Sequence, residues 1–237
     1  MNCINMVVII IPRVNNTQNT HHDNPSWFKL DNAAKIYPAI QNSTWAAMFR
    51  VSVTLKHKID RNILQEALNK TLKRFPSMAV RMRKGFFWYL LENNDNTPII
   101  QEDVINPCIR MKKNENRGFL FRVRYYNNRI ALEIFHVLTD GTGAMFFLKT
   151  LTAEYLKLLG HDIPASKGVL DVEEEPLLEE IEDGYGKFSV SRVKASRRED
   201  KAYHIKGTIE PKNIVHITTG ILPVDQVLKK AKEYKLS

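Results

Sequence analysis

The chain has 237 residues, of which 43% are hydrophobic and 26% are charged, a composition typical of a globular protein with a sizeable core. Its longest apolar run near the start, residues 6 to 11, is far shorter than the roughly 20 residues of a membrane-spanning helix, and no Lys or Arg precedes it as in a signal peptide, so we expect a cytoplasmic protein without a membrane span. The two cysteines, Cys3 and Cys108, form neither a disulfide framework nor a CxxC metal pair.

The net charge of +9 would attract phosphate groups through long-range fields. Basic residues are scattered, however, and residues 171 to 183 contain eight acidic side chains and no basic one. We therefore expect no specific nucleic-acid site. The simplest interpretation is a solvated surface with excess lysine, and the better of the specific alternatives is attraction of an anionic small molecule such as a phosphorylated cofactor.

Residues 1 to 24 are rich in Asn and Thr, which predicts a mobile N-terminal tail. His21, His22 and Asp23 lie within it, but adjacent side chains in a tail lack the fixed geometry of a metal site, so we expect no metal there. The next stretch, residues 30 to 38, predicts a short helix that Asp31 caps and Pro38 ends.

Apolar and polar residues alternate over residues 49 to 56, which indicates a half-buried strand. Asp60 then predicts the cap of a second helix, which ends at Phe75 and carries one apolar stripe. Two hairpins follow, one around Lys84 and Gly85 and one around Asn127 and Asn128. In the second hairpin Ile130, Leu132 and Ile134 alternate with Arg129, Ala131 and Glu133.

The strand of the second hairpin ends at His136, and a helix predicted after Asp140 and Gly141 ends near Gly160. One face of that helix is expected to hold Met145, Leu148, Leu151, Tyr155 and Leu156.

Charge changes sign between residues 165 and 207, which indicates a mobile charged linker. We thus divide the chain into the tail, a domain over residues 25–164, this linker, and a strand (213–219) and helix (from Asp225) in residues 208–237. A single strand and helix cannot bury their own apolar faces, so they either dock on the first domain or begin a second one.

The stretch "IFHVLTDGTG" combines a strand, a histidine, a turn and a helix. An imidazole has an ordinary pKa of about 6.5, so His136 could accept a proton from an alcohol or thiol at neutral pH. Asp140 could fix the turn by pairing with an arginine or by accepting backbone amide protons. Gly141 would supply freedom in φ, and Gly143 would let a ligand approach the helix start.

Other chemistries fit this stretch less well. A metal site would need a third ligand, a serine hydrolase would need a GxSxG elbow, and no phosphate-binding glycine pattern occurs. An ordinary strand-end histidine before a turn is the alternative that stays open. Trp88 and Tyr89 could line a pocket, although aromatic residues in strands more often pack in the core.

At these residues the sequence resembles a known family. "HVLTDG" is similar to the HxxxDG motif of the CoA-dependent acyltransferase superfamily, which includes chloramphenicol acetyltransferase, plant BAHD enzymes, peptide-synthetase condensation domains and alcohol acetyltransferases. The segments "KLDNAAKIYPAI", "FRVSVTL", "LNKTLKRFPSMAVRMRKGFFWYLL" and "TTGILPVDQVLKKAKEY" resemble its bacterial alcohol-acetyltransferase-like branch. Condensation domains have two consecutive histidines where this chain has Phe135 and His136. The plant BAHD enzymes also lack the first of these two histidines.

The resemblance implies a chloramphenicol-acetyltransferase-like α/β fold of the α+β type, a two-layer sandwich with a largely antiparallel mixed sheet. Two such domains would enclose a tunnel for acyl-CoA and a small alcohol or amine acceptor. His136 would be the general base, Asp140 would hold the loop through an arginine, and Gly141 would keep the turn open. Gly143, Trp88 and Tyr89 are candidate channel residues, and no metal or permanently bound cofactor is implied.

Members of the superfamily are much longer, and this chain ends at what resembles the start of the second domain. A separately encoded C-terminal half is therefore an expected partner. The first functional hypothesis is an acyltransferase with acetyl-CoA as the expected donor. This enzyme would be complete only together with the C-terminal half. The second is a non-catalytic remnant or binding module of the same fold, and the third, weaker one is nucleic-acid binding through the basic surface.

Overall fold

The structure is a computed structural model that describes residues 27–30, 34–41, 45–85, 89–112, 114–181, 204, 206–208, 211 and 220–235. The chain divides into two compact units, residues 1–204 and residues 205–237. The predicted tail over residues 1–24, with Cys3 and the His21–Asp23 cluster, lies outside the described residues.

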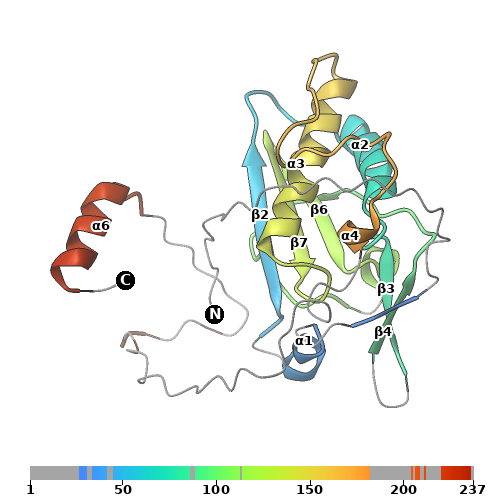
Figure 1. The fold of residues 1–237 in the computed structure, drawn as a ribbon. Helices are drawn as coiled ribbons and strands as arrows, with labels where there is room; N and C mark the ends of the chain where they lie inside the picture. The colour runs from blue at the N-terminus through green and yellow to red at the C-terminus, as the bar shows by residue number, and fades with distance from the viewer. Residues whose placement is uncertain are drawn as a thin grey trace. The chain divides into compact units, whose positions relative to one another are not determined.

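The larger sheet of the first unit contains four strands, β2 (Met48–Thr54), β5 (Gln101–Glu102), β6 (Phe121–Tyr126) and β7 (Arg129–Phe135). Their order is β2–β7–β6–β5, and Figure 1 shows β7 between β2 and β6. Strands β2 and β6 each pair antiparallel with β7, and β5 pairs parallel with β6. This mainly antiparallel mixed sheet confirms the predicted fold class.

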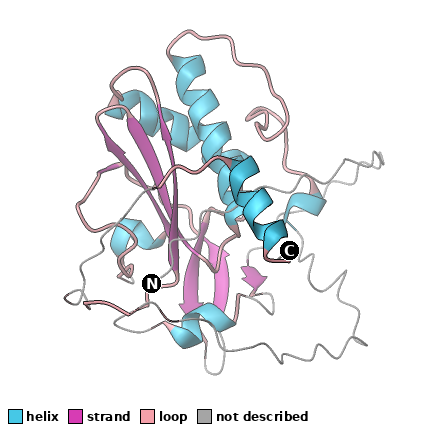
Figure 2. Ribbon diagram, turned by 90° about the vertical axis from the view of Figure 1, so that its left-hand side faces the viewer, coloured by secondary structure: helices cyan, strands magenta, loops and turns pink. Residues whose placement is uncertain are grey.

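A smaller sheet of the order β1–β4–β3 consists of β1 (Trp27–Lys29), β3 (Val80–Lys84) and β4 (Tyr89–Asn93). Strands β3 and β4 pair antiparallel, as the glycine-containing turn after Lys84 predicts. Figure 2 shows the two sheets as separate groups of strands. The sequence predicts the hairpins but not that they belong to different sheets, because partner choice depends on residues far apart in the chain.

Two long helices, α2 (Arg61–Arg74) and α3 (Gly141–Leu158), form the second layer. Asp60 caps α2 as predicted, since its Oδ1 accepts hydrogen bonds from the amides of Asn62 (2.8 Å) and Ile63 (3.1 Å). Gly160 follows α3 with φ of +89°, a value that glycine adopts at low cost, which explains why the helix ends there.

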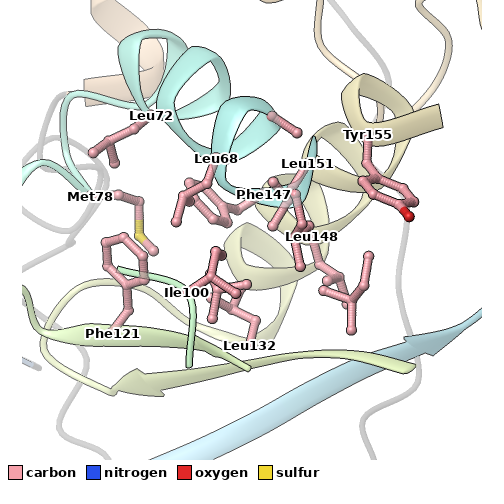
Figure 3. Close-up of a cluster of buried hydrophobic side chains, with 14 of the residues drawn as sticks. Leu68, Leu72, Met78, Ile100, Phe121, Leu132, Phe147, Leu148, Leu151 and Tyr155 are labelled. Atoms are coloured by element: carbon pink, nitrogen blue, oxygen red, sulfur yellow. The ribbon is translucent and has the colours of Figure 1, made fainter. Parts of the chain in front are cut away.

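The core lies between these helices and the inner face of the larger sheet, as Figure 3 shows. The apolar stripe of α2 faces this core, as its spacing predicts. For α3 the prediction is correct for Leu148, Leu151 and Tyr155, but Phe147 is fully buried whereas Met145 and Leu156 are half-buried. The core side chains labelled in Figure 3 are Leu68, Leu72, Met78, Ile100, Phe121, Leu132, Phe147, Leu148, Leu151 and Tyr155.

The first predicted helix differs from the observed one. Helix α1 spans Ile36–Ile40, so it passes through Pro38 instead of ending there. Pro38 is the third residue of α1, where a backbone N–H has no partner inside the helix, so proline costs little. The predicted cap Asp31 lies outside the described residues.

Part of the outer face of the larger sheet, around Glu133, is also buried, which the alternating pattern of a half-buried strand does not predict. The side chain of Glu133 on β7 is 0% exposed and lies 2.9 Å from Nη1 of Arg122 on β6, which is itself 0% exposed. Arg50 and Arg124 approach the same carboxylate at 3.3 and 3.4 Å. Opposite charges on adjacent strands thus replace apolar packing on this face.

A loop that leads into the 3-10 helix η1 (Glu115–Gly118) covers this charged cluster. The amide of Cys108 donates to Glu133 Oε1 at 3.2 Å, and Arg122 donates from both terminal nitrogens to the Ile109 carbonyl at 3.2 Å. Glu115 Oε1 lies 2.6 Å from Arg122 Nε. This loop lies between β5 and η1, outside the strands that it covers. The residue pattern of β6 and β7 therefore does not indicate that their polar face is covered.

The start of the predicted linker belongs to the first unit and packs on its helices α2 and α3. The amide of Leu170 donates to Thr150 Oγ1 at 3.0 Å, and the one-turn helix α4 (Leu178–Ile181) carries Glu180, which pairs with Arg74. Residues 165–181 therefore contribute contacts to α2 and α3, unlike the mobile linker expected from their acidic composition. The segment binds because α2 presents a cation that acidic side chains can neutralise.

In the second unit the structure describes helix α6 (Val224–Glu233), which agrees with the helix predicted near Asp225. None of its residues is buried. The predicted strand over residues 213–219 lies outside the described residues. Among the helices that the structure describes, none is long and apolar enough to cross a membrane.

Candidate functional site

His136 follows the last residue of β7, where its backbone amide donates to the Ala47 carbonyl at 3.0 Å. This bond ties the start of the turn to the residue before β2. Ala47 adopts φ of +51°, an uncommon conformation for a residue with a side chain. The side chain of His136 is half-buried, so part of the residue reaches the surface.

Two aromatic rings hold the imidazole of His136. The ring of Tyr37 stacks on it with a centroid distance of 4.5 Å and an angle of 10° between the planes. The ring of Phe49 on β2 lies at 4.8 Å with an angle of 52°. The side chain of His136 forms no hydrogen bond or ion pair with another described residue, and these two ring contacts are the packing that the structure describes around it.

Asp140 is the N-cap of α3. Its Oδ1 accepts a hydrogen bond from the Gly143 amide at 2.9 Å, and its backbone carbonyl accepts one from the Ala144 amide at 3.0 Å. The sequence suggests an arginine or a backbone amide as the partner of the Asp140 side chain, and in the structure the partner is the backbone amide of Gly143. The arginine that the family resemblance implies is not within ion-pair distance of Asp140 among the described residues. The cap fixes the turn after His136 without it.

The two glycines of the motif differ from the expectation. Gly141 is the first residue of α3 and does not have a positive φ, so the turn does not depend on its freedom in φ. At Gly143 a Cβ atom would lie 2.0 Å from Thr139 Oγ1 and 3.2 Å from Thr139 Cβ. Packing thus explains why a glycine stands at position 143, because Thr139 occupies the space that a side chain would need.

Of the aromatic pair predicted to line a channel, the structure describes only Tyr89. Tyr89 is the first residue of β4 and packs against a second apolar cluster that includes Val80, Phe135 and Val137. Trp88 lies outside the described residues. The sequence does not predict Tyr37 and Phe49 as neighbours of His136, since its local patterns indicate only a helix for Tyr37 and the core face of a strand for Phe49.

A pocket of about 310 Å³ adjoins the motif on the side of α2 and α4. Thr139 and Gly143 contribute to its wall, but His136 does not. Local sequence patterns do not predict this pocket, because its walls come from the end of α2, the start of α3 and the segment that carries α4.

Sequence comparison gives no match, either to a family model or to a curated protein. Structure comparison finds similar solved structures at low identity. The starter condensation domain of rhizomide synthetase RzmA has a TM-score of 0.48 and 12% identity over 60% of this chain and 41% of that chain. Polyketide synthase associated protein 5 from Mycobacterium tuberculosis has a TM-score of 0.43 and 16% identity over 56% of this chain and 33% of that one.

The tallysomycin biosynthesis protein TlmII is similar with a TM-score of 0.44 and 14% identity, over 55% of this chain and 36% of that chain. A mutant of the RzmA domain was solved in complex with C8-CoA. This chain therefore matches between 33 and 41% of the length of the solved structures named here.

Proposed function

We propose that the chain is an acyltransferase, or part of one, that moves an acyl group from acyl-CoA to an alcohol or amine. The observation that carries the proposal is the position of His136. A half-buried imidazole at the end of a central strand is held by Tyr37 and Phe49 and leaves its nitrogens without a partner among the described residues. Such a group can take a proton from an incoming substrate.

In the proposed reaction the acceptor O–H or N–H proton passes to His136 as the acceptor atom attacks the thioester carbonyl carbon. The tetrahedral intermediate then collapses, the C–S bond breaks, and the proton leaves with the CoA thiolate to form the thiol. Acyl-CoA is a co-substrate in this scheme, and no resident cofactor takes part. Acetyl is the expected acyl group, because the resemblance is to alcohol acetyltransferases.

The other motif residues support His136 indirectly. Asp140 caps α3 through the Gly143 amide and so fixes the turn that begins at His136. In the same turn, Thr139 occupies the space that a side chain at position 143 would need. The proposal also includes a channel along Trp88 and Tyr89, a cytoplasmic location and a C-terminal half encoded by a neighbouring reading frame.

The test measures CoA thiol release from acetyl-CoA with small alcohols and amines, using the chain alone and together with any adjacent encoded half. Because general-base catalysis contributes ~10²–10⁴ in rate, His136→Ala should lower kcat at least about 100-fold. His57→Ala is the matched control, since His57 is exposed and lies outside this site. Equal turnover in His136→Ala and the parent protein would refute the proposal.

A binding module without catalysis is the second candidate. It is favoured by the lack of any polar partner that would orient the imidazole among the described residues, since catalytic histidines commonly depend on one. Saturable binding of acetyl-CoA without thiol release, in the presence of the adjacent half, would support this candidate over the first.

A further inference from the structure

The pocket beside the motif has the features of a ligand site that does not involve His136. Its volume of about 310 Å³ lies at the lower end of the ~300–1,000 Å³ that small-molecule sites occupy. Most of its walls are apolar. The lining residues that matter here are Arg74, Ser77, Met78, Phe146, Glu180 and Ile181.

Arg74, the last residue of α2, places a cation in this wall. The residue is 4% exposed, and an arginine keeps its charge, so it needs an anion nearby. Glu180 supplies that anion with a two-pronged pair, in which Nη1 lies 2.6 Å from Oε2 and Nη2 lies 3.0 Å from Oε1. The buried Nε of Arg74 has no hydrogen-bond partner among the described residues, so one donor is unused.

The anion comes from a short segment, within which Glu180 Oε2 also accepts a hydrogen bond from the Leu177 amide at 3.0 Å. Glu180 lies on α4, a helix of four residues, and a helix this short is not stable by itself. Its side chain is 32% exposed, whereas that of Arg74 is 3% exposed. Figure 1 shows α4 at the end of the segment that returns from α3 toward the C-terminal end of α2. The carboxylate of Glu180 can therefore leave while the arginine stays in place.

We propose that this pocket binds a small carboxylic acid with an unbranched apolar tail, whose carboxylate replaces that of Glu180 on Arg74. A carboxylate matches the fork of the guanidinium in the way that Glu180 already does. The apolar wall formed by Met78, Phe146 and Ile181 takes the tail. Glu180 then acts as an internal competitor that keeps the arginine neutralised in the empty pocket.

Octanoate is the probe, and isothermal titration calorimetry on the full chain measures its affinity. Glu180→Gln removes the competing charge, so octanoate should bind about tenfold more tightly, in keeping with the strength of a charge-assisted pair. Glu92→Gln is the matched control, because it makes the same charge change on β4, away from the pocket, and should leave the affinity unchanged. Equal affinities in these two variants would overturn the proposal.

Two further measurements identify the groups involved. Octan-1-ol has the same tail without the charge, so it should bind at least about tenfold more weakly than octanoate. Arg74→Gln should abolish this preference for the acid, and Ser77→Leu should weaken both ligands because it fills the pocket. If Arg74→Gln does not fold, as circular dichroism would reveal, the comparison of Glu180→Gln with Glu92→Gln still decides. The proposal would also be overturned if octanoate bound neither the parent nor Glu180→Gln.

This site is independent of the proposed acyl transfer. His136 is not part of the pocket wall, so His136→Ala should bind octanoate as the parent does. Loss of octanoate binding in His136→Ala would contradict the separation of the two sites.

Discussion

The imidazole of His136 lies parallel to the phenol ring of Tyr37, with the ring centroids 4.5 Å apart. The two residues come from the turn after β7 and from α1, so a short helix near the start of the domain determines the orientation of the proposed base. Phe49 closes a second side of the imidazole at 4.8 Å. In this arrangement an aromatic contact takes the place that a carboxylate occupies in many catalytic histidine sites.

Replacing Tyr37 should therefore release the imidazole. An aromatic pair contributes about 0.5–1.5 kcal/mol, so Tyr37→Leu should lower the proposed kcat by up to about tenfold, while Tyr37→Phe, which keeps the ring, should retain most of it. Proton NMR gives a readout that does not need turnover. The His136 ring protons should be shifted upfield by the ring current in the parent and in Tyr37→Phe, and this shift should be smaller in Tyr37→Leu, where only Phe49 still contributes to it. An unchanged shift in Tyr37→Leu would contradict the stacking.

Asp140 should act as a helix cap whose charge matters little. Loss of a capping side chain costs about 0.5–2 kcal/mol, so Asp140→Ala should lower the free energy of unfolding by about 1 kcal/mol. Asp140→Asn keeps an oxygen that can accept from the Gly143 amide, and it should be close to the parent in urea denaturation. A large loss in Asp140→Asn would instead indicate that the charge has a partner, as the family resemblance implies.

Gly143 should be needed only because of Thr139. A Cβ at position 143 would lie 2.0 Å from Thr139 Oγ1, so Gly143→Ala should destabilise the chain despite alanine's advantage of about 1 kcal/mol in helices. In the Thr139→Ala background the hydroxyl is gone, and the same change should be much less costly or stabilising. Thermal unfolding of the four proteins in this cycle measures the coupling. Additive effects of the two substitutions would rule out this explanation.

Local signals in the sequence predict much of this fold. The cap at Asp60, the alternation along β2 and β7 and the turn at Asn127 depend on neighbouring residues, and the structure confirms all three. The stack of Tyr37 on His136 could not be predicted in this way, because it joins residues far apart in the chain. The same holds for the pocket, whose arginine and glutamate lie 106 residues apart.

The buried face of the larger sheet illustrates the limit of periodicity. Alternation along β7 correctly separates Ile130 and Ile134 from Glu133, but it cannot tell whether the polar side meets water or another segment. Here the loop before η1 covers it, and the amide of Cys108 reaches Glu133 at 3.2 Å. A charged residue in an alternating strand is therefore expected on the face that points away from the core, but the alternation does not indicate that its side chain is exposed to solvent.

Glu133 should be far more important for stability than an ordinary ion pair. Removing one partner from a buried charged network typically costs about 3–5 kcal/mol, because the remaining charges stay buried without compensation. Glu133→Gln should therefore lower the free energy of unfolding by about this amount, as it leaves Arg122 and Arg124 without their common anion.

Glu92→Gln is the control for the Glu133 variant. Glu92 pairs with Arg81 and Arg83, whose side chains are 46% and 71% exposed, so its loss should cost less than about 1 kcal/mol. Urea denaturation monitored by circular dichroism measures both variants. Equal losses in the two would show that the network on the outer face of the sheet adds nothing beyond a surface pair.

The carboxylates at the border of this network should make stability depend on acid pH. Burial raises the pKa of Asp103, but hydrogen bonds from Arg50 and Arg129 outweigh it, so the pKa is lower than its ordinary value. Burial likewise raises the pKa of Glu115. Hydrogen bonds from the Lys112 amide and from Arg122 outweigh this effect, so the pKa of Glu115 is also lower than its ordinary value. Because both values are lowered by folding, the folded state binds fewer protons than the unfolded chain in the acid range.

The resulting stability is fully present above the ordinary carboxyl pKa of about 4 and is lost as the pH falls through the lower values of the folded state. The free energy of unfolding should thus change little through these two groups between pH 7 and pH 5 and should decrease below about pH 4. Asp103→Asn should be less stable than the parent at pH 7 and should show a shallower decrease in acid. Parallel curves for Asp103→Asn and the parent from pH 7 to pH 3 would exclude a contribution from Asp103.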